Sequence, residues 1–191
     1  MTSVDDLWFL TTQAEQQAER AHHRLADAHE EFLDRTHSRR VSRSRFRTLA
    51  ERIADCGAPY GAHSVVYRPS GELLLVWHAG VDMWVVPGGE PDAGESFREA
   101  AERELREEAG VDPSADATCD GLAMNVRVDL RCDEYSTWGV LPLFEVRVEE
   151  EVAPDPADPD GEITDARWFG ELPEETRDRE DLLAWREYAL E

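Results

Sequence analysis

The chain has 191 residues, of which 41% are hydrophobic, so it is long enough to bury one good core and to form a single domain with an extension. Its formal net charge is -23, and it contains no lysine, so all twenty of its basic residues are arginine. Such an acidic surface repels duplex nucleic acid, because binding to the phosphate backbone needs clustered lysine or arginine. The sequence therefore excludes a duplex-binding protein, and it has no apolar run long enough to cross a membrane.

The N-terminal part of the chain is predicted to be helical. Residues 5 to 36 carry a thin, alanine-rich seam at heptad spacing: Leu7, Thr11, Ala14, Ala18, Ala21, Leu25, Ala28 and Phe32. A second helix is expected from Ser44 to Asp55, with Phe46, Leu49, Ala50 and Ile53 on its apolar face. We therefore predict an N-terminal helical extension over residues 1–57, in the form of a helical hairpin. The hairpin packs either on the rest of the chain or across a homodimer, and both arrangements are open.

A basic cluster lies just before and at the start of the second predicted helix: Arg39, Arg40, Arg43, Arg45 and Arg47. These arginines could contact phosphates, or they could form a solvated helix face that pairs with acidic surface. We favour the second interpretation because charge runs on helices are usually solvated.

The remainder, residues 58–191, alternates short strand patterns with few helices. Strands are expected at Ala62 to Tyr67, Glu72 to Trp77, Trp84 to Val86, Gly121 to Asp129, Trp138 to Val148 and Ile163 to Phe169. Pro69, Ser70 and Gly71 turn the first two strands into a hairpin, and a last helix is predicted from Glu174 to Ala189. Residues 153–161, rich in aspartate and proline, are expected to form a mobile acidic loop. This order of elements predicts an α/β fold, an α/β/α sandwich with a mixed sheet.

A helix between Ser96 and Gly110 carries the most informative pattern. Ser96 and Glu99 form a capping box, and Gly110 stands where a left-handed C-terminal residue is wanted. An apolar stripe packs one side of this helix: Phe97, Ala100, Ala101, Leu105 and Ala109. Three glutamates at helical spacing point toward a different rim: Glu104, Glu107 and Glu108. Because like charges at this spacing repel each other, either solvent or divalent cations must screen them.

Together with the preceding glycine-rich turn, this helix resembles the signature of the Nudix hydrolases, G-x5-E-x7-R-E-U-x-E-E-x-G-U, in which U is aliphatic. Every specified position is filled: Gly89, Glu95, Arg103, Glu104, Leu105, Glu107, Glu108, Gly110 and Val111. The segment Trp84 to Gly89 is similar to the strand that leads into this motif in the family. The resemblance covers roughly residues 60 to 190 and leaves out the first fifty or so.

The resemblance implies a role for each of these residues. Glu104, Glu107 and Glu108 would bind Mg2+ or Mn2+, whose preference for oxygen ligands the carboxylates satisfy. Arg103 would pair with Glu95 to orient the loop and helix, and Gly88 and Gly89 would shape the turn. Either Glu107 or Glu108 would accept a proton from the attacking water. Many family members add an acidic residue from a later loop, and here Glu162 is the best candidate, although several neighbouring carboxylates crowd the same region.

The family resemblance implies a Mg2+-dependent hydrolase that cleaves a diphosphate linkage in a nucleotide-type small molecule. The alternative is a non-catalytic domain that senses a nucleotide or ADP-ribose and contacts a partner through its N-terminal helices. Isomerisation of a prenyl diphosphate also occurs among relatives, but the chain shows no convincing Cys-Glu pair for that chemistry. The intact glutamate triad favours the hydrolase, because a sensor has no chemical need for it. The base and the linked group are not specified by the motif.

The acidic, lysine-free composition is similar to that of proteins from salt-accumulating archaea. At molar ionic strength the Debye length is about 3 Å, so the self-repulsion of the chain is largely screened. A GC-rich genome would also favour arginine over lysine, but it does not require the excess of acid. Met1 to Leu10 lack the features of a secretory leader, and the three cysteines lack metal-ligand spacing. We therefore expect a halophilic, cytoplasmic protein with reduced thiols.

Overall fold

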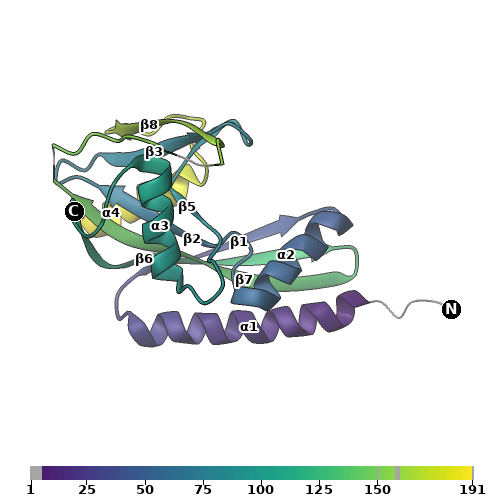
Figure 1. The fold of residues 1–191 in the computed structure, drawn as a ribbon. Coiled ribbons are helices and arrows are strands. Elements are labelled where there is room, and N and C mark those ends of the chain that lie inside the picture. Colours follow the sequence, from purple (N-terminus) through teal and green to yellow (C-terminus); the bar gives the residue numbers. More distant parts are fainter. Residues whose placement is uncertain (1–5, 150, 158–159, 191) are drawn as a thin grey trace. The chain divides into compact units, whose positions relative to one another are not determined.

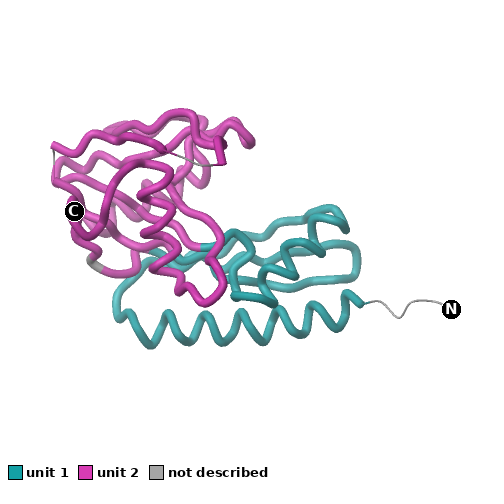
Figure 2. The backbone as a smooth tube through the Cα atoms, in the orientation of Figure 1, with its two compact units in different colours: residues 1–61, 124–142 teal, residues 62–123, 143–191 magenta. Residues whose placement is uncertain are grey.

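The computed structural model describes residues 6–149, 151–157 and 160–190. The elements in chain order are α1 (Asp6–Ala28), β1 (Leu33–Arg40), α2 (Arg43–Cys56), β2 (Ala62–Tyr67), β3 (Leu73–His78), β4 (Met83–Val85), β5 (Gly88–Gly89), α3 (Phe97–Ala109), β6 (Ala117–Cys132), β7 (Tyr135–Val148), β8 (Ile163–Phe169) and α4 (Arg179–Leu190) (Figure 1). They form two compact units: residues 1–61 with 124–142, and residues 62–123 with 143–191 (Figure 2). The long strands β6 and β7 each contribute to both units.

Unit 1 contains α1, β1 and α2 together with the turn-proximal parts of β6 and β7. The alanine seam predicted for α1 is buried as far as Leu25, and the apolar face predicted for α2 is buried completely. Small residues let the two helices approach closely, because a Cβ atom placed on Gly57 would lie 2.5 Å from the Cβ atom of Ala21. Gly57 also ends α2 in the left-handed conformation that glycine adopts most readily.

The prediction of one helix over residues 5–36 is wrong beyond Ala28, and the N-terminal part is therefore not a simple helical hairpin. Residues 33–40 form β1, which pairs in parallel with β6 from Leu33 opposite Met124 to Arg40 opposite Arg131. The burial of β1 alternates along the strand, but polar residues occupy most of its inward positions. Its sequence consequently lacks the apolar alternation by which an isolated strand is recognised.

Unit 2 is built on a mixed sheet. Strand β2 is parallel to β7 and antiparallel to β3 and β5, whereas β3 is antiparallel to both β4 and β8. The strands agree with those predicted to within a few residues at their ends. Helix α4 begins at Arg179, later than the predicted Glu174, because the preceding residues pair with β4 at Thr176 and Asp178 has a positive φ of 52°.

Helices α3 and α4 cover opposite faces of this sheet. On β2, Ser64 donates a hydrogen bond to the carbonyl oxygen of Ala101 in α3, at 3.4 Å. Tyr67, three positions further along β2, instead contacts the indole of Trp185 in α4. Since successive side chains of a strand point to opposite faces, the two helices lie on different sides. The α/β sandwich with a mixed sheet, predicted from the order of elements, is confirmed.

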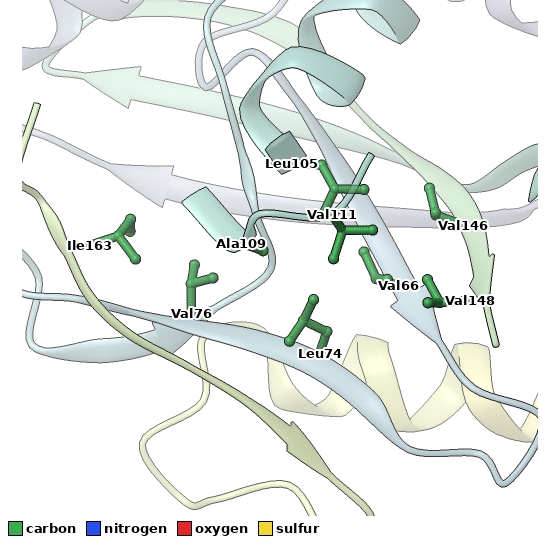
Figure 3. Packing of buried hydrophobic residues seen from close by; sticks show 9 residues of the cluster. All are labelled: Val66, Leu74, Val76, Leu105, Ala109, Val111, Val146, Val148 and Ile163. Carbon is green, nitrogen blue, oxygen red and sulfur yellow. The ribbon is translucent and has the colours of Figure 1, made fainter. Parts of the chain in front are cut away.

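The core beneath α3 is a cluster of aliphatic side chains drawn from β2, β3, β7, β8 and the end of the helix (Figure 3). Its members are Val66, Leu74, Val76, Leu105, Ala109, Val111, Val146, Val148 and Ile163. Burying each Val, Leu or Ile side chain stabilises the fold by roughly 1.5–3 kcal/mol. This packing fixes the axis and rotation of α3, and it therefore determines where the polar side chains on the other rim of the helix can point.

The acidic segment before β8 is irregular, as expected, but its described residues are hydrogen-bonded to the end of α3. The backbone N–H groups of Asp155 and Ala157 donate to the carbonyl oxygens of Ala109 and Glu107, at 2.9 and 3.0 Å. Upstream, the carbonyl oxygen of Val152 accepts hydrogen bonds from Arg68 and Trp168. The bonds from Asp155 and Ala157 satisfy carbonyl groups that the end of α3 would otherwise leave unpaired. Two residues of the predicted loop, 158 and 159, lie outside the described residues.

Candidate active site

The ends of α3 are fixed by local hydrogen bonds. The Ser96 hydroxyl accepts from the Glu99 N–H at 3.2 Å, and the Glu99 carboxylate accepts from the Ser96 N–H at 2.8 Å. Gly110 ends the helix with a φ of 68°, and its N–H donates to the carbonyl oxygen of Arg106. The capping box and the glycine stop predicted from the sequence are thus present, and they set the boundaries of the segment that carries the glutamates.

Arg103 is the centre of an ionic network on the polar rim of α3. Its guanidinium makes two hydrogen bonds to Glu95, from Nε at 3.1 Å and from Nη2 at 3.0 Å. Nη1 lies 2.7 Å from Glu104 and 3.5 Å from Glu107, while Nη2 also donates to the carbonyl oxygen of Glu90. The hydrogen bonds from Arg103 are the main reason that the pKa of Glu95 is lowered, and the same bonds raise the pKa of Arg103. The Arg103 guanidinium thereby links the turn before α3 to two glutamates of the helix.

The glycine pair of β5 lies between β2 and these glutamates. The Gly88 N–H donates to the Glu108 carboxylate at 2.9 Å, while Gly88 and Gly89 pair with His63 and Ala62 of β2. A Cβ atom on Gly89 would collide with the carboxylate of Glu104, and one on Gly88 would collide with the backbone of Ala62 and the ring of His63. Close approach to backbone therefore requires glycine at position 88, whereas at position 89 the flexible end of the Glu104 side chain would have to move.

The side chain of Glu104 is less exposed than that of Glu107, 17% against 38%. Its pKa is raised, chiefly because burial disfavours the charged carboxylate and further because Glu107 and Asp160 carry like charges; Arg103 opposes the shift. A carboxylate in this setting gains much from a nearby cation. Oxygen donors of this kind suit Mg2+ or Mn2+, so the donor set fits the ion that the motif implies.

Within the part of the chain that the structure describes, no three or more His, Cys, Asp or Glu side chains are grouped so as to hold a metal ion. The contacts of the glutamates show how they are arranged instead: Glu104 and Glu107 turn toward Arg103, and Glu108 turns toward the Gly88 N–H. Their role as metal ligands stays a prediction.

Glu162, the loop carboxylate predicted to join the site, contacts β3. Its carbonyl oxygen accepts a hydrogen bond from Ala79, and its carboxylate, 65% exposed, lies 3.4 Å from Nε2 of His78. The loop residue whose charge acts on Glu104 is Asp160, two positions earlier. The sequence offered no signal to separate these two acids, because both lie in one acidic run. The catalytic role of Glu162 stays a prediction, and Asp160 is an additional candidate.

A second group that sequence reasoning missed lies beneath the glycine turn. The pKa of His63 is lowered from 6.5 to about 4, chiefly by burial and also by the positive charge of Arg177, while Asp178 opposes both effects. Nδ1 of His63 and Oγ1 of Thr176 are buried and have no hydrogen-bond partner among the described residues. Thr176 also pairs with Trp84. The N–H of Trp84 donates to the carbonyl oxygen of Glu175, and the carbonyl oxygen of Trp84 accepts from the N–H of Arg177. His63 is consequently a neutral hydrogen-bonding group held against Gly88.

Aromatic rings line the adjoining strands. The ring of Trp84 packs edge-on against Trp77 at 5.4 Å and against Phe169 at 4.8 Å, with the guanidinium of Arg167 5.7 Å from its centroid.

The NUDIX domain family matches residues 58–185. The chain belongs to the NUDIX family. It is thus a member of the Nudix hydrolases, as the motif between Gly89 and Val111 predicted. The match covers the whole of unit 2 except its last residues.

One relative matches a shorter segment of the chain. A Bacillus subtilis (strain 168) protein described as "Putative 8-oxo-dGTP diphosphatase" is 44% identical over 57 residues, which are 30% of this chain and 38% of that protein. The match therefore spans well under half the length of this relative. No described helix is both long and apolar enough to span a membrane.

Among solved structures, the NUDIX domain of NrtR from Shewanella oneidensis, in complex with ADP ribose, is 19% identical. The likeness covers 68% of this chain and 86% of that chain, with a TM-score of 0.51, and it supports the NUDIX fold. A MutT NUDIX hydrolase from Burkholderia pseudomallei is 23% identical over 64% of this chain and 94% of that one, with a TM-score of 0.47.

Proposed function

We propose that this chain is a pyrophosphohydrolase that uses a divalent cation, Mg2+ or Mn2+, and a water molecule to cleave the diphosphate linkage of a nucleoside diphosphate derivative. The observation that carries the proposal is the Arg103 network, which gathers Glu95, Glu104 and Glu107 at the glycine turn of a complete Nudix motif. Glu104 is partly buried and lies against Gly89, an arrangement that solubility of the helix alone does not explain.

Glu104, Glu107 and Glu108 would hold the cation. When bound, such an ion neutralises phosphate charge and lowers the pKa of water. The chain's own residues also have further tasks. Arg103 keeps the turn and the helix in register by bridging Glu95 and Glu104, and Glu108 anchors the turn through the Gly88 N–H. Either Glu107 or Glu108 accepts the proton that water releases.

The nucleoside would bind near the glycine turn, where His63, Thr176 and the rings of Trp77 and Trp84 supply hydrogen-bonding and stacking groups. Two of these groups carry buried polar atoms without partners in the described structure, and ligands often satisfy such atoms. The names of the relatives suggest which compounds to try first, namely 8-oxo-dGTP and ADP-ribose. Nucleotide sugars, NADH, nucleoside triphosphates and dinucleoside polyphosphates complete the panel.

The test measures turnover of this panel with and without Mg2+ or Mn2+, at low and high salt. Glu107→Gln and Glu108→Gln should each abolish most of the activity while circular dichroism shows an intact fold. Glu102→Gln is the matched control, because Glu102 lies on the same helix but pairs with Arg98 and Arg106. Equal turnover by all three variants would refute the proposed site.

The alternative function is sensing of a nucleotide or ADP-ribose without hydrolysis. One observation favours it: Arg103 already supplies a positive charge to two of the three glutamates. Calorimetric binding of one panel compound, without release of product and without dependence on Mg2+ or Mn2+, would establish the sensor. Mn2+ binding that is lost in Glu104→Gln would favour the hydrolase before any substrate is known.

A further inference from the structure

His78 is the last residue of β3, and each nitrogen of its ring lies near a polar group. The backbone N–H of Gly80 donates to Nδ1 at 3.1 Å, and Nε2 lies 3.4 Å from the carboxylate of Glu162. A backbone N–H can only donate, so Nδ1 is the acceptor and the neutral ring carries its proton on Nε2. The ring therefore has its N–H at the nitrogen nearest Glu162.

This arrangement excludes two common roles of histidine. A metal ligand and a general base both need a ring nitrogen with an available lone pair. In the neutral ring the lone pair of Nδ1 is engaged by Gly80, and Nε2 carries the proton. The turn also confines the ring, because a Cβ atom on Gly80 would lie 3.1 Å from Cε1 of His78. His78 can consequently act on the site only through the residues that it contacts.

The residue that His78 contacts ends the acidic segment before β8. The backbone N–H of Ala79 donates to the carbonyl oxygen of Glu162 at 2.9 Å, and the next residue, Ile163, is buried in the core. The register of β3 and β8 shifts between Trp77 and His78, so the regular ladder of the two strands is interrupted just before Glu162. The end of the segment is thus held by one backbone hydrogen bond and by the contact with the His78 ring.

The other end of the segment is held at α3. The backbone N–H of Ala157 donates to the carbonyl oxygen of Glu107 at 3.0 Å. Asp160 lies between the two points of attachment, and its negative charge contributes to the raised pKa of Glu104. The segment therefore passes close to the glutamates of the helix. Where its carboxylates lie depends on both attachments, and His78 supplies the side chain at one of them.

We propose that His78 is a positioning residue for hydrolysis, whose contact with Glu162 holds the segment that carries Asp160 and Glu162 at the rim of α3. This inference rests on the proposed function, because a positioned carboxylate matters only where a reaction takes place. Glu162 is 65% exposed, and an ion pair of that kind adds little to stability. Its effect is expected on the rate instead, since a displacement of about 1 Å can slow a reaction by about a hundredfold.

The first test measures kcat and KM on a panel compound that the wild type hydrolyses. His78→Ala and Glu162→Ala should each lower kcat about tenfold or more, with little change in KM. The double variant should lose no more than the larger single effect, because His78 acts through Glu162. The matched control is His23→Ala, which removes an imidazole that lies 3.0 Å from Glu19 on α1 and should leave kcat unchanged.

Two conservative variants separate the contacts of the ring. The amide of His78→Gln can still donate to Glu162 from about the position of Nε2, whereas His78→Asn can replace only the acceptor for the Gly80 N–H. His78→Gln should therefore recover most of the wild-type kcat, and His78→Asn should resemble His78→Ala. Equal kcat values for His78→Gln and His78→Asn would overturn the proposal. Circular dichroism shows whether each variant keeps its fold.

Amide hydrogen exchange provides a measurement without hydrolysis. The Ala79 N–H, which is bonded to Glu162, should exchange about tenfold or more faster in His78→Ala than in the wild type or His23→Ala. Unchanged exchange at Ala79, or full kcat in His78→Ala, would overturn the role of His78 and leave the proposed function intact. A wild type that hydrolyses no panel compound would instead refute the proposed function, and a role of His78 in hydrolysis with it.

Discussion

At the scale of single residues, Arg103 contacts three carboxylates at once. Its guanidinium joins Glu95, before the helix, to Glu104 and Glu107, on the helix. Without it, these carboxylates would repel one another around a partly buried glutamate whose pKa is already raised by burial. The planar, bidentate geometry matters as much as the charge, since a lysine ammonium cannot make both hydrogen bonds to Glu95.

Arg103→Ala should lower the free energy of unfolding by about 1.5–3 kcal/mol, the usual worth of hydrogen bonds to charged groups. Arg103→Lys should recover only part of this loss. Urea denaturation measures both changes. Arg106→Ala is the control, because Arg106 is on the same helix and pairs with the exposed Asp112. Equal losses for the two alanine variants would show that Arg103 is an ordinary surface residue.

His63 gives the fold a pH dependence of its own. Its pKa falls from 6.5 to about 4 on folding, because burial disfavours the charged ring and Arg177 repels it. The unfolded chain thus takes up a proton near pH 6.5, while the folded chain stays unprotonated until about pH 4. Stability from this residue is present above pH 6.5 and is lost as the pH falls toward 4.

We expect the free energy of unfolding of the wild type to fall by on the order of 3 kcal/mol across this pH window through His63 alone. His63→Gln should flatten the decline, because glutamine does not titrate. The measurement is urea denaturation at pH 7 and pH 4 in the same ionic strength. His23→Gln, which replaces an exposed histidine of α1, serves as control. Identical slopes for the wild type and His63→Gln would contradict the assigned pKa.

At the scale of elements, the position of the glutamates depends on where α3 begins. The capping box between Ser96 and Glu99 sets that point, and the aliphatic cluster beneath Leu105 sets the rotation of the helix. The segment before β8 then closes the other end, where Asp155 and Ala157 donate to the last carbonyl groups. The position of the glutamates therefore depends on contacts made by residues outside the rim of the helix.

Ser96→Ala should lower the free energy of unfolding by about 1 kcal/mol, whereas Ser96→Asp should preserve it, because aspartate also accepts from the N–H groups of a first turn. Equilibrium denaturation measures both variants. Ser136→Ala removes an exposed hydroxyl from β7 and should change little. If Ser96→Ala were as stable as the wild type, the cap would not determine the start of α3.

The elements that could be predicted are those whose signals are local. Strand β8 follows from a short segment with β-branched and aromatic residues, and helix α3 follows from its capping box and its glycine stop. Strand β1 could not be found in this way, because its partner β6 lies far along the chain and its inward residues are mostly polar. Pairing between distant segments is decided by tertiary contacts, which override local propensity.

The candidate site divides in the same way. The motif predicted the contact between Arg103 and Glu95, because Glu95 lies in the turn just before α3 and Arg103 lies on α3. It could not show that Glu104 and Glu107 also turn toward Arg103, nor that Asp160 acts on Glu104. The state of His63 likewise depends on residues from the segment before α4, which the fold brings beneath the glycine turn.

At the scale of the whole molecule, charge is the dominant property. With 43 acidic and 20 basic residues, the described helices and strands expose many more carboxylates than arginines can pair. Most of the ion pairs on the surface are worth about 1 kcal/mol or less. Repulsion among the many carboxylates therefore destabilises the folded chain, and no single contact offsets this long-range effect. Dissolved salt reduces the repulsion by screening it.

We predict that stability rises steeply between low and molar KCl, because the Debye length falls from about 10 Å at 0.1 M to about 3 Å at 1 M. Urea denaturation at a series of KCl concentrations, with EDTA present to remove divalent ions, measures the effect. A variant with Glu15, Glu30 and Glu187 changed to glutamine is the matched control, since these residues are exposed and lie outside the site. It should need less salt than the wild type to reach the same stability. Full stability of the wild type in dilute buffer, without added salt or divalent ions, would show that the acidic surface is not an adaptation to salt.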